Sequence, residues 1–547
     1  MVDQMDIVTF DTPISNTLVN VTSSKITEPF SAAILIFSHE QTDSADNAHG
    51  VLGIGFIGID GALSPEVGMA FQMANARTAT PLARSLHYNA TTSPTRCIKG
   101  PIGTNILTLH IEATYNASIA GGVQLNFTLV DATGGPSGGP VRTKCTAILF
   151  AGLARAATGS ATSSTLGVHE DVGVSPTFFQ PDVLFFLSSD GSLNTTSIAD
   201  GVPNLGLAVR GGGQITSYVN VDDVTEPTDA DAAVLSNKAW MISTRTAGAL
   251  NLITASIAID STGFTATSSS GSPDTVYLAL KFSGVYRAAV ANLAVAAATG
   301  EQTFTDFGFT PGVVFGMGTA LTTLDTATDG ATASVAEFFA IGPSVSRAYT
   351  VHHEEGINIT NPPVSSAHTR QEDVAELLYN HTGTVVRRAT WAGPATNGFK
   401  LNYSTASQAG LLTAMGLALG LTTSDTEQVS DLSAINVGLA TTDTERLTDS
   451  VVISGTGNMI AADTEQLSDQ GAMAVGLAIS ETEQISDSVA FEAKMVLVDV
   501  ETITDFVVLE AAPIGPPVAA DPFGWTYGGG AERGGAFQAG AVKGTVL

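Results

Sequence analysis

Charged residues are scarce in this chain. Asp, Glu, Lys and Arg make up 14% of its 547 residues, against about 25% in typical soluble domains. Basic residues are the scarcer kind, because 22 Lys and Arg stand against 52 Asp and Glu, a net charge of 22 − 52 = −30. A phosphate-binding face would have to form against this negative field, so we expect no direct nucleic-acid binding. The thin charged shell also predicts that other subunits cover much of the surface.

Cysteines and long apolar runs are nearly absent. Cys97 and Cys145 can pair only with each other, and two thiols do not make a disulfide framework; the sequence does not decide whether they pair. The most apolar stretch, 411–421, is too short to cross a bilayer of about 30 Å as a helix, so we expect no membrane span. The segment Met1 to Gln4 has no basic region and no apolar core, which predicts synthesis in a cytosol without a secretion signal.

Patterns that carry catalysis are missing as well. No Ser/His/Asp or Cys/His arrangement is recognisable, and the glycine runs do not follow a strand-to-helix phosphate signature. Aromatic residues make up 7% of the chain, and the three tryptophans, Trp240, Trp391 and Trp525, are few for a sugar-binding cleft. The sequence therefore predicts no enzyme, no catalytic residue and no cofactor.

Two segments come closest to a metal site. His352 and His353 are adjacent, but neighbouring side chains on a strand point to opposite faces, so we interpret 351–356 as a polar loop. Acidic heptads near the C-terminus offer carboxylate oxygens to a hard cation. The heptads lack the glycine turn of calcium loops. Acidic residues at solvated strand edges, where they discourage unwanted pairing, explain the pattern equally well. We predict no metal ligand and leave calcium binding by the heptads open.

One strand-like stretch occurs three times. It begins at Phe30, Phe179 and Phe309, and each copy runs from an aromatic residue through turn-compatible residues into β-branched and aromatic residues. Such a run is typical of a strand buried on both faces. A length of 547 residues is expected to hold three or four domains. Three openings of this kind therefore suggest three copies of one domain.

A second landmark supports the repeat. Gly122, Gly263 and Gly398 each start another strand-like stretch, and they follow their opening phenylalanine by 92, 84 and 89 residues. Short strands separated by Gly, Pro, Asn, Asp and Ser predict an all-β chain of three tandem antiparallel β-sandwich domains of jelly-roll type. The alternative is one large irregular β domain. The landmarks divide the chain into an N-terminal arm or edge strand (1–27), sandwich units (28–159, 160–300 and 301–420), a short-repeat region (421–510) and a Gly/Pro-rich tail (511–547).

The short-repeat region is the most specific pattern. Its heptad, Asp425-Thr426-Glu427-Gln428-Val429-Ser430-Asp431, recurs at 443–449, 463–469 and 481–487 and in degenerate form at 499–505, in steps of 18, 20, 18 and 18 residues. Units this short must stack on one another or on other chains. A ladder of short strands, a small β-solenoid and an intertwined oligomeric shaft all satisfy this requirement, and helix is the less favoured alternative. The tail after residue 511 is expected to be a linker or a peptide that orders on a partner.

These residues support a resemblance. Sandwich units marked by Phe-x-Pro-x-Val-Leu-Phe and Gly-Phe-x-Leu-Asn-Tyr, followed by Asp-Thr-Glu-Gln-Leu-Ser-Asp repeats, resemble structural proteins of tailed-bacteriophage virions over residues 28–510. The resemblance is one of modular order and carries over no catalytic residue. It implies a symmetric oligomer, with a trimer favoured, that contacts other virion proteins.

The expected function is that of a tail-fibre or tail-associated protein located in the virion. One alternative is a capsid-decoration or head-fibre protein. Another is a carbohydrate-binding module that contacts a host-surface glycan. A bacterial adhesin would need a secretion signal that the N-terminus does not display.

Overall fold

The computed structural model describes most of the first 419 residues and the strands of the C-terminal region. The described residues are 3–38, 47–48, 51–60, 66–73, 83–88, 98–101, 109–130, 144–162, 169–173, 179–189, 198–199, 204–222, 229–246, 249–268, 274–329, 335–353, 367–380, 383–419, 423–426, 440–447, 452–453, 459–467, 471–473, 477–485, 489–492, 495–503 and 507–510. Residues 1–419 form one compact unit and residues 420–547 another. All regular elements in these ranges are β-strands, and none of the described segments is a helix able to cross a membrane.

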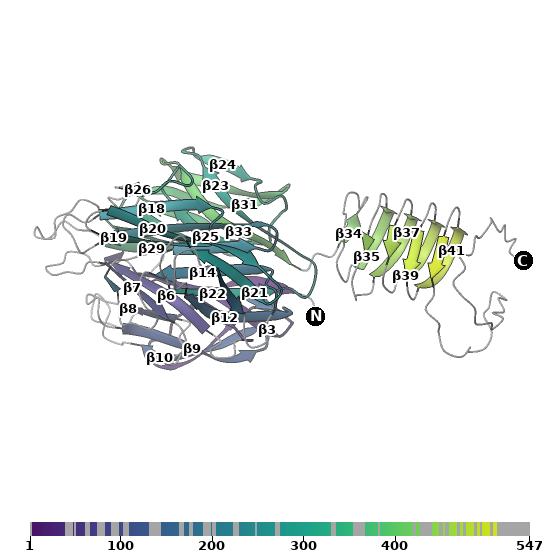
Figure 1. The fold of residues 1–547 in the computed structure, drawn as a ribbon, viewed down its shortest axis with the longest axis horizontal. Coiled ribbons are helices and arrows are strands. Elements are labelled where there is room, and N and C mark those ends of the chain that lie inside the picture. Colours follow the sequence, from purple (N-terminus) through teal and green to yellow (C-terminus); the bar gives the residue numbers. More distant parts are fainter. Residues whose placement is uncertain are drawn as a thin grey trace, which may run out of the picture. The chain divides into compact units, whose positions relative to one another are not determined.

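The first compact unit contains three β-sandwiches of eleven strands each (Figure 1). Sandwich 1 comprises β1 (Gln4–Asp11), β2 (Thr17–Thr22), β3 (Phe30–Ser38), β4 (Asn47–Ala48), β5 (Val51–Gly58), β6 (Glu66–Met73), β7 (Ala83–Tyr88), β8 (Ile98–Pro101), β9 (Leu109–Ile119), β10 (Gly122–Val130) and β11 (Lys144–Ala151). Sandwich 2 comprises β12 (Arg155–Thr162), β13 (His169–Gly173), β14 (Val183–Ser189), β15 (Ile198–Ala199), β16 (Asn204–Val209), β17 (Gly213–Asp222), β18 (Asp229–Ser236), β19 (Trp240–Thr246), β20 (Ala249–Ile259), β21 (Gly263–Ser268) and β22 (Asp274–Lys281). Sandwich 3 comprises β23 (Tyr286–Val295), β24 (Gly300–Phe304), β25 (Val313–Thr319), β26 (Thr328–Asp329), β27 (Val335–Ile341), β28 (Ser346–His353), β29 (Ala367–Glu372), β30 (Glu376–Tyr379), β31 (Val385–Ala395), β32 (Gly398–Ala406) and β33 (Gly410–Leu419).

The three sandwiches share one topology, which confirms the predicted tandem all-β fold. In sandwich 1 the larger sheet runs β1-β11-β3-β5-β6-β7 and the smaller sheet runs β2-β10-β9-β8, and the other two sandwiches repeat both orders strand for strand. All these pairings are antiparallel. The segment β1–β2 lies along β11–β10 as a ribbon that spans both sheets, as in a jelly roll, whereas β3, β5, β6 and β7 form a simple meander.

Strand pairing corrects the expected domain boundaries. Residues 1–27 contribute β1 and β2, which pair with β11 and β10 at the edges of sandwich 1, so of the two interpretations, arm or edge strand, the structure shows edge strands. Residues 153–159 were expected to close the first unit, but β12 pairs with β22 and opens the second. Residues 293–300 were expected to close the second unit, yet they belong to β23 and β24 of the third. One face of an edge strand is exposed, so the strand mixes polar and apolar residues, and this composition resembles that of a linker.

Each sandwich gives one short strand to a neighbour. The two-residue strand β15 of sandwich 2 completes the larger sheet of sandwich 1, β26 of sandwich 3 completes that of sandwich 2, and β4 of sandwich 1 completes that of sandwich 3. The exchange is cyclic, since every sandwich is once a donor and once an acceptor. It covers a sheet edge that would otherwise present unpaired backbone groups. The three sandwiches are therefore interlocked within one chain.

The larger sheets are buried on both faces because they share a central core. One continuous apolar cluster includes residues from all three sandwiches, and its aromatic centre joins Phe56, Phe185 and Phe315. The ring centroids of Phe56 and Phe185 are 6.3 Å apart and those of Phe185 and Phe315 are 5.9 Å apart. This arrangement explains the uninterrupted apolar runs of β3 and β25, every residue of which is buried.

The returning glycines mark a close approach of two strands. A Cβ at Gly122 would lie 2.1 Å from the carbonyl oxygen of Val21, and a Cβ at Gly398 would lie 1.7 Å from that of Phe304. Both glycines begin the strand that pairs with the edge strand of the smaller sheet, β2 or β24. In sandwiches 1 and 3 this landmark therefore reflects the same steric requirement.

The C-terminal unit is a parallel β-solenoid. Its strands are β34 (Thr423–Thr426), β35 (Ala440–Leu447), β36 (Val452–Ile453), β37 (Met459–Leu467), β38 (Gly471–Met473), β39 (Leu477–Ile485), β40 (Val489–Glu492), β41 (Met495–Ile503) and β42 (Val507–Glu510). They form two parallel sheets, β34-β35-β37-β39-β41 and β36-β38-β40-β42, and from β35 onward the chain alternates between them. Figure 1 shows the stacked coils in green and yellow. Each sequence repeat is one coil, so of the interpretations left open the solenoid is the one observed.

The heptads stack in register through the solenoid. Backbone pairing aligns Thr426 with Thr444, Thr444 with Thr464, and Thr464 with Thr482. Adjacent strands lie about 4.8 Å apart, so equivalent residues of successive repeats form ladders along the stack. The tail from 511 to 547, with Trp525, lies outside the described residues, as does Cys97.

The strand exchange can be tested with an engineered disulfide. Ala232 of β18 and Thr328 of β26 are antiparallel partners, and such partners have Cα atoms about 4.5–5.5 Å apart, within the range of a disulfide. We expect an A232C/T328C variant to form this bond under oxidising conditions, identified by peptide mass spectrometry. The single variants serve as controls, and a double variant that stays reduced would contradict the exchange.

Candidate functional site

Sandwich 3 holds a buried ionic cluster between its two sheets. The cluster comprises Glu337 on β27, Glu376 on β30, Arg387 on β31 and Tyr403 on β32, each at most 2% exposed. Arg387 Nε lies 2.7 Å from Glu376 Oε1; the N–H is not aimed at that oxygen, so the contact is an ion pair and not an aligned hydrogen bond. The Tyr403 hydroxyl donates to Glu376 Oε2. Arg387 Nη2 donates to the carbonyl oxygen of Thr319 at 2.8 Å.

Glu337 completes the cluster from the larger sheet. Its Oε1 accepts the Leu377 N–H at 2.7 Å, whereas its Oε2 is buried without a hydrogen bond. Two glycines leave room for these groups: a Cβ at Gly410 would lie 2.0 Å from Arg387 Nη1, and a Cβ at Gly318 would lie 2.7 Å from Glu337 Oε2. The chain thus makes space for charged groups where a side chain would normally fill the core.

The cores between the sheets of the other two sandwiches are mainly apolar, although Asn204, which strand register places where sandwich 3 has Glu337, is buried as well. Sandwich 2 packs the rings of Phe186, Trp240, Phe264 and Tyr277 against one another, and sandwich 1 has an aliphatic and aromatic core. Buried ion pairs seldom stabilise a fold more than a well-packed apolar core does. Because the cluster has no access to solvent, its effect falls on the stability of sandwich 3 and not on a bound substrate.

Burial makes the carboxyl groups of the cluster hard to ionise. It raises the pKa of Glu337 well above the usual value of 4.5, and the negative charge of Glu376 raises that pKa further. Burial also raises the pKa of Glu376, although Arg387 and Tyr403 favour its ionised form. Burial and the neighbouring Glu376 raise the pKa of the Tyr403 hydroxyl. When Glu337 keeps its proton, the positive charge of Arg387 is balanced by the negative charge of Glu376 alone.

The raised pKa of Glu337 predicts how stability changes with pH. In the unfolded chain a glutamate loses its proton near pH 4.3, while folded Glu337 keeps it to higher pH. The folded state therefore binds more protons, and the free energy of unfolding falls as pH rises from the unfolded pKa through the folded one. We expect urea unfolding at pH 5 and pH 8 to show this fall in the wild type and a smaller fall in Glu337→Gln. Glu301→Gln, at an exposed pair with Lys400, is the control, and equal falls in all three proteins would contradict the prediction.

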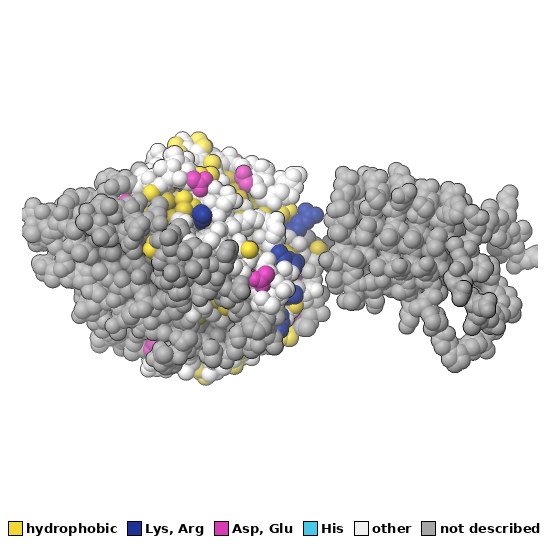
Figure 2. All heavy atoms as spheres, viewed as in Figure 1, with side chains coloured by type: hydrophobic (Ala, Val, Ile, Leu, Met, Phe, Trp, Pro, Cys, Tyr) yellow, Lys and Arg dark blue, Asp and Glu magenta, His cyan; other side chains and the backbone are white. Residues whose placement is uncertain are grey.

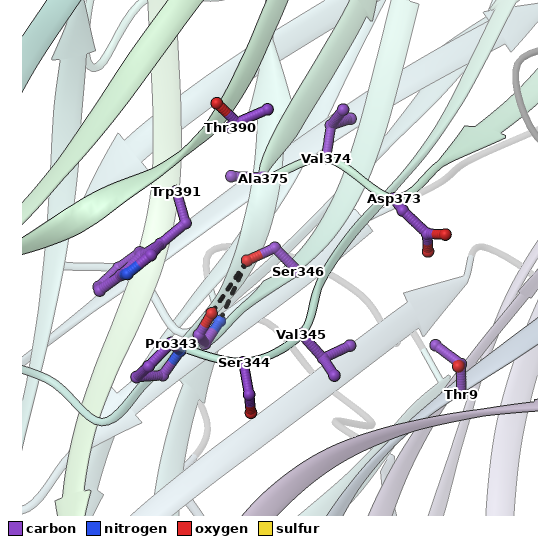
Figure 3. Close-up of a pocket in the computed structure, with 11 residues that line it drawn as sticks. Thr9, Pro343, Ser344, Val345, Ser346, Asp373, Val374, Ala375, Thr390 and Trp391 are labelled. Carbon is purple, nitrogen blue, oxygen red and sulfur yellow. Dashed lines mark hydrogen bonds between the residues drawn. The ribbon is translucent and has the colours of Figure 1, made fainter.

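A pocket lies between sandwich 1 and sandwich 3 (Figure 3). It has a volume of about 440 Å³, within the range of small-molecule sites. Its walls are Thr9 of β1, the turn 342–346 between β27 and β28, residues 373–375 before β30, and Thr390 and Trp391 of β31. Figure 3 shows Trp391 and Pro343 at one end and Asp373 and Thr9 at the other.

Neighbouring contacts hold the lining groups in place. Trp391 is half-buried, and its ring is stacked on Phe399 at a centroid distance of 5.9 Å and an interplanar angle of 8°. A β-bulge between Trp391 and Gly393 shifts the register of β31 at this point; bulges commonly redirect side chains beside binding sites. Ser346 Oγ donates to the Gly342 carbonyl at 3.1 Å and so closes the turn.

Charged groups stand at the rim of the pocket. Asp373 is exposed, and one of its oxygens pairs with the buried Arg347 guanidinium. Lys25 of sandwich 1 donates to Ser344 Oγ at 2.8 Å and pairs with Asp6 at 3.1 Å, which ties the turn to sandwich 1. The rim therefore carries both signs of charge. On the face that Figure 2 shows, the coloured Lys, Arg, Asp and Glu side chains are few among the described residues.

The structure describes the side chain of only one of the two adjacent histidines. His352 is buried on β28 with its ring 5.0 Å from that of Tyr379, and the side chain of His353 lies outside the described set. Within the described residues, His, Cys, Asp and Glu form no group of three that could hold a metal ion. The strand β28 replaces the expected polar loop at 351–353. Cys145 is buried and not in a disulfide.

Sequence reasoning missed both the ionic cluster and the pocket. A signal for the cluster existed, because Glu337 interrupts the apolar run of β27 and a charge within a strand buried on both faces needs a partner. The partners themselves lie 39 to 66 residues further along the chain, beyond the reach of any local pattern.

Comparison with known proteins adds no assignment: no family model matches this chain, and no curated protein matches its sequence.

Proposed function

We propose that this protein is a structural component of a tailed-phage virion, in a tail-fibre or tail-associated position. It acts by assembly and not by catalysis. In this role the three-sandwich body is a globular node and the solenoid is a shaft or packing element. The sequence resembles virion proteins in the order of its modules along the chain. The proposal adds a role for each of these modules in the particle.

The observation that carries this proposal is the cyclic exchange of edge strands among the three sandwiches. Each sheet is completed by its neighbour, and Phe56, Phe185 and Phe315 meet in one core. A chain so interlocked resists separation into its modules, which suits a mechanical part of a particle.

The solenoid supports the same role. Among the described strands, β34 and β41 end one sheet of the solenoid and β36 and β42 end the other, and stacked repeats commonly need a cap or a partner at such ends. Further copies of this chain or other virion proteins would cover these ends. The low share of charged residues fits a surface that is covered on assembly.

A capsid-decoration or head-fibre protein is the alternative within the virion. Gold-labelled antibodies against the chain, applied to particles of the phage that encodes it and imaged in negative stain, separate the two positions. Label on the tail is the expected result, and label on the head would favour the alternative. Particles without label would overturn both.

The mass of the full-length protein in solution tests the assembly step. We expect light scattering to report a homo-oligomer, with a trimer favoured. A monomer that persists at high concentration would contradict self-assembly and leave only assembly with other virion proteins.

A further inference from the structure

The pocket between sandwich 1 and sandwich 3 offers an aromatic surface at one end and hydrogen-bonding groups at the other. Trp391 supplies a flat apolar ring that Phe399 holds from behind. Thr9, Ser344 and Thr390 are exposed and offer hydroxyl groups, and Asp373, whose side chain is 63% exposed, offers carboxylate oxygens. Hydroxyls both donate and accept, whereas the carboxylate only accepts.

This combination selects among ligand classes. An apolar ligand would cover the Thr9 and Thr390 hydroxyls without bonding to them, at a cost in free energy. An anion would face the Asp373 carboxylate, and the two nearby cations, Lys25 and Arg347, are already paired with Asp6 and Asp373. A metal ion would find one carboxylate, already paired with Arg347, where hard cations prefer six or more oxygens. A sugar ring has an apolar C–H face and a rim of hydroxyl groups, which matches both ends of the pocket.

The repeated topology does not by itself produce the tryptophan of the pocket. Strand register identifies Ile257 of sandwich 2 and Tyr115 of sandwich 1 as the equivalents of Trp391. Their pairing partners, Ala266, Leu125 and Leu401, each lie three residues after the returning glycine. The tryptophan is thus present at one of three equivalent places.

Sandwich 2 shows what occupies the corresponding space when the tryptophan is absent. There the Gln214 side chain accepts from the Ile257 N–H at 2.8 Å and donates to the Ile257 carbonyl at 3.2 Å. The equivalent backbone is therefore covered by the chain itself.

We propose that this pocket binds one pyranose unit of a polysaccharide, with the sugar ring stacked on Trp391 and its hydroxyl groups bonded to Asp373, Ser344 and Thr390. The site lies on the body and does not depend on where in a virion the protein is placed. If no sugar binds in this pocket, the proposed assembly role still stands, because particle labelling and the mass in solution test that role separately.

The test uses the full-length protein and a panel of simple pyranosides and their disaccharides, first on a glycan array and then by saturation-transfer NMR. We expect at least one sugar to bind and to alter tryptophan fluorescence. Trp391→Ala should weaken binding at least about tenfold, as for an aromatic hot spot, and Trp391→Phe should retain part of it. Tyr115→Ala, at the equivalent position of sandwich 1, is the matched control and should bind as the wild type does.

A second variant, Thr9→Trp, blocks the pocket and keeps the Trp391–Phe399 contact, so it tests the site even if Trp391→Ala does not fold. Thr9 is an exposed residue of β1, so a larger side chain there fills the pocket without removing a core contact. We expect this variant to melt as the wild type does and to lose sugar binding. The proposal is overturned if no sugar of the panel binds, or if Trp391→Ala and Thr9→Trp bind as tightly as the wild type.

Discussion

Replacing Arg387 with methionine is expected to lower the free energy of unfolding by about 3–5 kcal/mol, the usual cost of breaking a buried ion pair. Arg387 is fully buried and is the cation that pairs with Glu376. Methionine leaves the buried Glu376 carboxylate without a compensating charge and leaves the Thr319 carbonyl without its donor. Urea unfolding of the full-length protein, followed by tryptophan fluorescence, measures the loss.

Two further variants separate charge from packing. The triple variant Glu337→Met, Glu376→Met and Arg387→Met removes the cluster as a whole, and we expect it to regain much of the lost stability, because apolar groups of similar volume often replace buried ion pairs without cost. Lys400→Met, at a partly exposed pair in the same sandwich, should change stability by less than about 1 kcal/mol. A single Arg387 variant as stable as the Lys400 variant would show that the cluster is not strongly coupled to folding.

Replacing Phe185 with alanine is expected to destabilise all three sandwiches together, by about 3–5 kcal/mol. Phe185 contacts both Phe56 and Phe315 in the shared core and is fully buried. Truncation leaves a cavity in the core that the three sandwiches share, and strand exchange prevents one of them from unfolding alone. Calorimetry should therefore show the transition of residues 1–419 moving to lower temperature as one event.

The control for this prediction is Ile14→Ala, at an exposed side chain of sandwich 1; we expect a change within about 0.5 kcal/mol. A Phe185→Ala protein in which sandwich 2 melts separately, while the other two keep their original transition, would contradict the shared core. Hydrogen exchange on the central strands β3, β14 and β25 would locate the change.

The strand periods and both repeats are readable from the sequence alone. Runs such as 30–37 and 313–315 cannot be exposed, whatever the fold, because each residue is apolar or small. The 18-to-20-residue spacing of the heptads likewise requires stacking, and the structure supplies it as parallel coils. These conclusions rest on local composition and on self-similarity along the chain.

Tertiary structure decided where each sandwich begins, which strands cross between sandwiches, and which groups meet in the core. The polar segment 4–22 joins sandwich 1 by pairing with β11 and β10, and β4, β15 and β26 each pair with the edge strand of a neighbouring sandwich. Edge pairing depends on geometry and not on side-chain pattern, since backbone hydrogen bonds accept any sequence. Glu337 and Arg387 likewise find each other only through folding, because the attraction between two charges depends on their distance and on the exclusion of water, neither of which residue order contains.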